Sequence, residues 1–140
     1  GGYKYTQGDE QNPTATDVTS FAIMALKASL GTGSETDEAA KEFAIGKSKA
    51  IVVGSRVDGT HWEAYGDFDM SGTAYAIMAL VSLDQDVTES VDWLKTNISP
   101  TEGGVIAPWS APGSDLFSSA QSLLALSKLS FIDVLENTVK

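Results

Sequence analysis

The sequence has no cysteine, a single histidine, and only 9 basic residues against 19 acidic ones. Without cysteine the chain has no disulfide, no thiol nucleophile and no thiolate metal ligand. His61 is the only imidazole, which argues against a zinc site because zinc is held by several His or Cys ligands. The formal charge of −10 repels phosphate backbones and anionic lipid headgroups, so we expect neither nucleic acid nor a membrane as a partner.

Long apolar runs are also missing. No run approaches the roughly 20 residues that a transmembrane helix needs, and no secretory signal peptide stands at the amino end. The 140 residues are enough for one domain with a substantial core. Because the chain opens abruptly on Gly1-Gly2-Tyr3, we expect a single domain over residues 1–140 that forms part of a longer protein.

An internal repeat is the strongest pattern that the sequence does contain. The pentapeptide AIMAL occurs at 22–26 and again at 76–80, and a looser copy, SLLAL, occupies 122–126. This spacing fits a pair of helices with their connections, as in helical repeat proteins. When the copies are aligned on their last Leu, a hydroxyl residue stands seven positions before it in each: Thr19, Thr73 and Ser119.

The repeats predict three pairs of helices. The segments around the repeated pentapeptides are apolar nearly all round, which predicts inner helices buried on every side. The segments at 36–53, 88–98 and 131–140 mix charges with apolar anchors and predict outer helices with one solvent-exposed face. The strand-like AIVV at 50–53 is assigned to the end of an outer helix, and no strand is predicted. Asp86 and Glu89 resemble a capping box at the start of the second outer helix.

The order of these elements resembles that of a known helical repeat. An outer helix with an aromatic anchor (VDWL) is followed by Glu102-Gly103-Gly104 and then by a hydroxyl-bearing entry to a helix that ends in Ala-Leu. This is similar to the repeat of the squalene cyclase and protein prenyltransferase β-subunit superfamily. The resemblance implies an all-α fold, an α/α toroid whose helices alternate in two concentric layers. Three inner and outer pairs would make about half of the ring.

The half ring implies a partner, since large exposed apolar flanks are uncommon in soluble monomers. We expect a second copy, or the remainder of the parent chain, to complete the ring. Non-enzymatic relatives in the resembling superfamily include secreted carriers and microbial surface proteins. The compartment is left open, and an extracellular or cell-surface location is compatible with the acidic, cysteine-free composition.

The acids before the second inner helix allow three interpretations. The resembling cyclases protonate their substrate with an Asp-x-Asp-Asp-Thr-Ala motif, but Ser71 and Gly72 replace two of its acids here, and only Asp17 in the first repeat falls on the middle position. Asp67-x-Asp69-x-Ser71-Gly72 also matches the first half of a calcium-binding EF-hand loop, yet its twelfth position is a methionine. The structural interpretation is helix capping by Asp69, Asp115 and the pair Thr16-Asp17, with Asp67 as a solvated loop acid.

The three segments that precede the inner helices carry many of the aromatic residues. The resemblance implies that these segments meet at the mouth of a central cavity, where aromatic rings suit small apolar or sugar-like ligands. We expect no catalytic residue, no metal and no cofactor, and we predict a non-catalytic binding or assembly module. The alternative is a divergent cyclase-like enzyme that uses Asp17 as its acid. The predicted ligand-binding residues are Tyr5, Asp17, Trp62, Tyr65 and Trp109.

Overall fold

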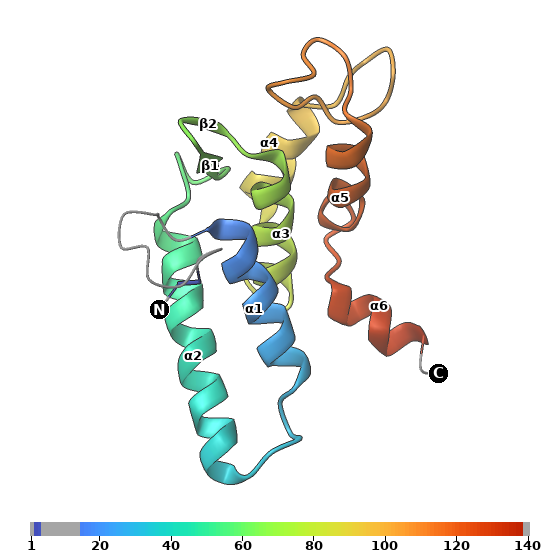
Figure 1. Cartoon of the computed structure of the whole chain (residues 1–140). Helices are drawn as coiled ribbons and strands as arrows, with labels where there is room; N and C mark the ends of the chain where they lie inside the picture. Colours follow the sequence, from blue (N-terminus) through green and yellow to red (C-terminus); the bar gives the residue numbers. More distant parts are fainter. Residues whose placement is uncertain (1, 4–14, 139–140) are drawn as a thin grey trace.

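The computed structural model describes residues 2–3 and 15–138 of the chain, and its helices follow the repeat pattern (Figure 1). The mainly α-helical class expected from the sequence is confirmed. The AIVV segment lies at the end of a helix, as predicted. The helices are α1 (Thr16–Ala28), α2 (Glu35–Gly54), α3 (Met70–Val81), α4 (Thr88–Thr96), α5 (Leu116–Leu126) and α6 (Phe131–Thr138).

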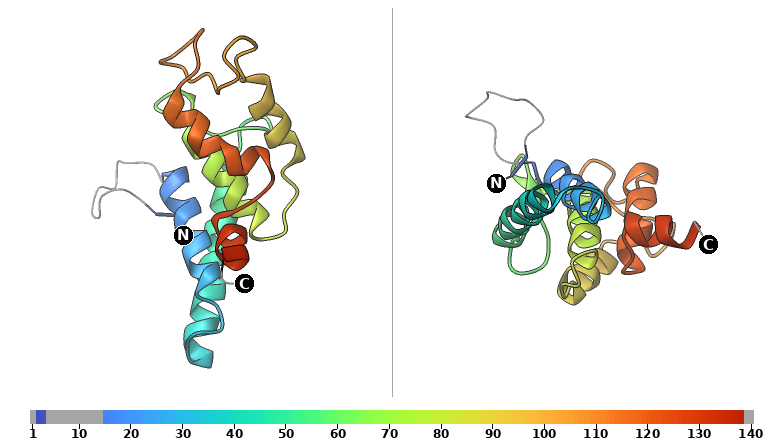
Figure 2. Two further views of the ribbon diagram at one scale, coloured as in Figure 1. Left: turned by 90° about the vertical axis from the view of Figure 1, so that its right-hand side faces the viewer. Right: turned by 90° about the horizontal axis from the view of Figure 1, so that it is seen from below.

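Helix α3 lies at the centre of the molecule, between α1 and α5. Helix α2 packs against α1, and α4 packs against both α3 and α5. Viewed from below, α2 and α4 lie at the periphery of the row formed by α1, α3 and α5 (Figure 2). In α3 every residue from Ala76 to Leu80 is fully buried, because α1, α4 and α5 pack against this helix. The prediction of an inner helix buried all round is therefore confirmed for residues 76–80 of α3, whereas Tyr75 is only partly buried.

The other two inner helices differ from that prediction. Phe21 of α1 remains 43% exposed, and Leu116 and Leu123 of α5 remain 86% and 65% exposed. Each of these helices has another inner helix on one flank only, whereas α3 has one on both. The same periodicity in the sequence thus leads to different burial, because burial depends on how many neighbours a helix has.

Helix α6 also departs from the expected pattern of pairs. It leaves the lower end of α5 and projects away from it (Figure 1). Its first residue, Phe131, stacks on Phe21 of α1 with 6.0 Å between ring centroids. Through this contact α6 packs against α1 instead of taking a place behind α5 like that of α4 behind α3.

The sequence did not predict the short antiparallel hairpin between α2 and α3. It comprises β1 (Glu63–Ala64) and β2 (Asp67–Phe68), and the two-residue turn between them has positive φ at both Tyr65 (57°) and Gly66 (85°). Two positive φ values are typical of a type I′ hairpin turn. Glycine adopts this conformation readily, but tyrosine rarely does, so the local sequence gave little sign of the hairpin.

The hydroxyl residue that recurs in the sequence has one structural role in all three repeats. Its oxygen accepts a hydrogen bond from a backbone N–H of the segment that leads into the same helix. The carbonyl of that donor residue accepts a bond from the N–H of the helix N-cap residue. This pair of bonds attaches each leading segment to the first turn of its inner helix. The donor and hydroxyl pairs are Tyr3 with Thr19, Trp62 with Thr73, and Val105 with Ser119.

The helix caps predicted from the sequence are present at two of the inner helices. Asp69 accepts a bond from the N–H of Gly72, and Asp115 accepts one from the N–H of Ser118. Helix α1 differs, because its N-cap is Ala15 and no side chain caps it. The predicted capping box at α4 is wrong, since Val87 is the N-cap and makes no side-chain cap. The Asp86 carboxylate instead accepts a bond from the N–H of Thr88, two residues ahead.

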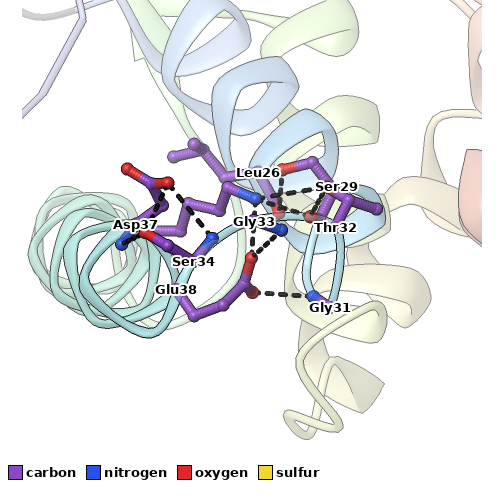
Figure 3. Close-up of polar contacts among 9 residues, drawn as sticks. Leu26, Ser29, Gly31, Thr32, Gly33, Ser34, Asp37 and Glu38 are labelled. Atoms are coloured by element: carbon purple, nitrogen blue, oxygen red, sulfur yellow. Dashed lines mark hydrogen bonds and ion pairs between the residues drawn. The ribbon is translucent and has the colours of Figure 1, made fainter.

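The turn between α1 and α2 is held by a local network of polar contacts (Figure 3). Glu38 accepts bonds from the N–H groups of Gly31 and Gly33 at 2.7 and 2.9 Å. Ser34 and Asp37 form a complete capping box at the start of α2. The Gly31 amide, with help from Lys41, holds the pKa of Glu38 below its ordinary value. This network fixes where α2 begins and directs it back along α1.

Candidate binding cavity

The described part of the chain forms a cavity of about 570 Å³, within the size range of small-molecule sites. Helices α1, α3 and α5 contribute its walls, together with the β1–β2 hairpin and the segment around Trp109. Two positions of the repeat face it from each inner helix. These are the positions nine and five residues before the last Leu of each aligned pentapeptide: Asp17 and Phe21, Ser71 and Tyr75, and Phe117 and Gln121.

Aromatic side chains make up much of the cavity wall. Phe21 and Tyr75 lie side by side on it, with their ring centroids 4.4 Å apart and the ring planes at 46°. Tyr65, Trp109 and Phe117 are 100%, 65% and 66% exposed, which places them at the rim. Partly exposed aromatic rings around a cavity are suited to a ligand that enters from solvent and buries an apolar surface.

A chain of hydrogen bonds connects α3 and α5 across the cavity. Ser71 Oγ donates to Gln121 Oε1, and Gln121 Nε2 donates to the Tyr75 hydroxyl oxygen at 2.6 Å. Both ends of the Gln121 amide are therefore engaged, and its orientation is fixed. The Tyr75 hydroxyl proton is left to act as a donor toward a further acceptor.

Three carboxylates supply the charge of the cavity wall: Asp17, Asp67 and Asp69. Burial raises the pKa of Asp69 above its ordinary value, the N–H of Gly72 opposes this, and the nearby Asp17 carboxylate raises it further. Burial likewise raises the pKa of the Tyr75 hydroxyl, with Asp17 and Asp69 as additional causes. Proton release from either group adds negative charge to a region that already carries it.

The residues predicted from the sequence fall in different places. Asp17, Tyr65 and Trp109 lie together on the cavity wall. Trp62 lies in the core, where it is 0% exposed and donates its Nε1–H to the carbonyl of Val52 at 2.7 Å. It faces away from the cavity because its backbone is tied to Thr73 and its ring points toward α2. Tyr5 lies outside the described residues.

Several wall residues were not predicted, namely Phe21, Tyr75, Phe117 and Gln121. A signal for three of them was present in the repeat. Phe21, Tyr75 and Gln121 each stand two residues after the recurring hydroxyl, so they take the same place on their helices. These three residues were not predicted as binding residues, because the inner helices were expected to be buried throughout and candidates were therefore sought only in the segments that precede them.

The remaining candidate chemistry of the sequence lies elsewhere. The His61 ring stacks on Trp93 at 4.3 Å, and its Nε2 lies 3.7 Å from Glu63. It is not part of the cavity wall. Within residues 2–3 and 15–138, no group of three or more acidic or histidine side chains is arranged to hold a metal ion. In the half EF-hand pattern, Asp67 lies in β2, Asp69 caps α3, and Met78 is fully buried in α3.

Comparison with known proteins yields no matching family model, no matching curated protein and no matching solved structure. None of the helices in the described part of the chain is both long enough and apolar enough to cross a membrane.

Proposed function

We propose that the chain is a non-catalytic repeat domain of the squalene cyclase and prenyltransferase type that acts as a binding module. Its ligand is a small apolar or sugar-like molecule held in the cavity between α1, α3 and α5. The observation that carries this proposal is that two equivalent repeat positions on each of three helices line one cavity. Repeats that direct equivalent side chains toward one space are consistent with helices arranged around a common axis, as in a toroid.

The aromatic content of the cavity supports a binding role. Phe117 and Trp109 keep about two thirds of their surface exposed, at 66% and 65%, although each could bury apolar area against a ligand. Burial of apolar surface contributes about 25 cal/mol per Å². A ligand that covers the rim and reaches Phe21 therefore gains affinity without any rearrangement of the fold.

The binding role is tested by NMR titration of the purified chain with two neutral probes, 2-phenylethanol and methyl β-glucoside. We expect at least one probe to shift the amide signals of the first turns of α1, α3 and α5. Phe117→Ala is expected to weaken that binding severalfold, since it removes a rim ring. Phe43→Ala removes an equally exposed ring (69%) from α2 and serves as the control. Shifts confined to other parts of the protein would contradict the proposal.

The alternative is a divergent cyclase-like enzyme with Asp17 as its acid. The observation in its favour is that Asp17 lies on the wall of an aromatic cavity. Under this alternative, Asp17→Asn abolishes formation of a product from an isoprenoid substrate while the fold stays intact. Failure of the unmodified chain to consume any isoprenoid substrate would rule the alternative out.

The domain also presents a surface suited to assembly. Leu116, Ala120 and Leu123 are exposed and share one face of α5, since they stand at i, i+4 and i+7. In the repeat, the corresponding flank of α3 is covered by α5. A second copy, or the remainder of the parent chain, would cover this face and extend the row of inner helices.

A further inference from the structure

We propose that the chain assembles head to tail, with the exposed face of α5 packed against α1 of a second copy. This inference rests on the assembly role proposed above, specifies the partner and the surface that the partner offers, and does not depend on the ligand of the cavity. The observation behind it is that equivalent repeat positions on the three inner helices differ in burial.

One flank of each inner helix, flank A, is formed by the positions three, six and ten residues before the last Leu of the aligned pentapeptide. All three residues are fully buried on α3, and Ser20 and Ile23 are fully buried on α1. On α5 the equivalent residues are exposed, with Leu116 at 86% and Leu123 at 65%. The same flank is therefore covered on two inner helices and uncovered on the third. Its members are Thr16, Ser20 and Ile23 on α1, Met70, Ala74 and Ile77 on α3, and Leu116, Ala120 and Leu123 on α5.

The opposite flank, flank B, is formed by the positions one, four and eight residues before the same Leu, and apart from Val18 it consists of Gly, Ala and Ser. On α3 and α5 these residues are buried. On α1, Ala25 is exposed, and Val18 and Ala22 are only partly buried. Flank B is thus uncovered at the other end of the row of inner helices. Its members are Val18, Ala22 and Ala25 on α1, Gly72, Ala76 and Ala79 on α3, and Ser118, Ser122 and Ala125 on α5.

The contact between neighbouring inner helices joins flank A of one helix to flank B of the next. Helix α3 is the inner neighbour of both α1 and α5, so the buried flank A of α1 and the buried flank B of α5 both face α3. Equivalent residues on the cavity side also meet in succession, because Phe21 contacts Tyr75 and Tyr75 accepts a hydrogen bond from Gln121. The same type of contact is therefore made twice within one chain, from α1 to α3 and from α3 to α5.

The two uncovered flanks are complementary to each other. Helix α5 offers the large apolar side chains of Leu116 and Leu123, and α1 offers the small side chains of Ala22 and Ala25. Helices pack by fitting the side chains of one into the grooves of the other, so small residues opposite large ones permit a close approach. Neither flank contains a charged residue at these positions. One chain thus carries both halves of a contact that it already makes internally, and a second copy can continue the row through a heterologous interface.

Ala25→Glu and Leu123→Glu test the two flanks separately. Each variant places a charge at a position that is exposed in the single chain, and glutamate is a good helix former, so the fold is retained. By sedimentation, we expect each variant to self-associate at least about tenfold more weakly than the unmodified chain, because burial of an unpaired charge in the contact is unfavourable. Ala39→Glu, the same substitution at an exposed position of α2, is the control and should associate like the unmodified chain.

An equimolar mixture of the two variants tests the head-to-tail arrangement directly. Ala25→Glu retains an unmodified α5 face, and Leu123→Glu retains an unmodified α1 face, so the mixture can form one unmodified contact. We expect a species with one copy of each variant, although neither variant associates alone. Native mass spectrometry identifies this species, because the two variants differ in mass.

The other outcomes separate this inference from the proposed function. If Ala25→Glu associates like the unmodified chain while Leu123→Glu does not, the α5 faces pair with each other, which overturns the head-to-tail contact and leaves the assembly role intact. A mixture that stays monomeric also overturns the head-to-tail contact. An unmodified chain that stays monomeric at high concentration overturns both the contact and the assembly role. The binding role of the cavity is independent of these results, since it is measured with the neutral probes.

Discussion

At the scale of single residues, two aspartates with the same role in the helix differ in environment. Asp69 and Asp115 each cap an inner helix, but burial raises the pKa of Asp69, whereas the N–H of Ser118 and its hydroxyl lower the pKa of Asp115. The position in the repeat is therefore shared, while the electrostatic surroundings are not. Asp69 faces the cavity and another carboxylate, whereas Asp115 interacts with the side chains of Ser118 and Trp109.

We expect the two caps to titrate on opposite sides of the ordinary value of 3.8. The free energy of unfolding, relative to Asp69→Asn, should fall as pH rises from 3.8 through the raised pKa of Asp69. Relative to Asp115→Asn, it should rise as pH increases through the lowered pKa of Asp115 toward 3.8. Asn caps helices about as well as Asp, so capping itself is retained in both variants. Carboxyl NMR titration and urea unfolding at several pH values measure these effects, and the same sign for both variants would contradict the assignment.

The two tryptophans form a second contrast at this scale. Trp62→Phe removes buried volume and the hydrogen bond to the Val52 carbonyl, and should lower the free energy of unfolding by roughly 2 kcal/mol. Trp109→Phe changes a side chain that is 65% exposed and should alter it by no more than about 0.5 kcal/mol. Urea denaturation distinguishes them. Equal losses would mean that Trp62 is not the core residue that the structure shows.

At the scale of elements, the recurring hydroxyl attaches each leading segment to its helix by a hydrogen bond. Thr73→Val keeps the shape of the side chain but leaves the N–H of Trp62 without its acceptor in a buried place. We expect a loss of about 1–3 kcal/mol in the free energy of unfolding. Thr36→Val, on an exposed position of α2, is the control and should be nearly neutral. Hydrogen exchange of the Trp62 amide should become faster in Thr73→Val, and an unchanged rate would argue against this role.

At the scale of the whole molecule, the uncovered face of α5 is expected to lead to self-association. Sedimentation of the isolated chain should show a species of two copies that dissociates on dilution. Leu123→Glu places a charge on the exposed face and should give a monomer, because burying an unpaired charge in an interface is unfavourable. Val53→Glu, on α2 and 45% exposed, should leave association unchanged. A chain that stays monomeric at high concentration would contradict the assembly role.

The repeat by itself determined the helices of this protein and their order. Apolar periodicity, with Asp69 and Asp115 as caps, placed α1 to α6 because hydrogen bonding and side-chain spacing within a helix are local properties. The hairpin was missed because Tyr65 takes a positive φ that its type does not favour. The direction of α6 was missed because it depends on the contact of Phe131 with Phe21, which are distant in sequence.

Only the tertiary structure determines which residues form the cavity. Asp17, Tyr65 and Trp109 were recognised as candidates from the sequence, yet the packing of α1, α3 and α5 brings them together and adds Phe21 and Tyr75 between them. The same packing places Trp62 in the core, although it resembles Tyr65 and Trp109 in its sequence context. The physical reason is that periodicity specifies which side chains share a face of a helix, whereas the neighbours of that face determine whether it becomes core, surface or cavity wall.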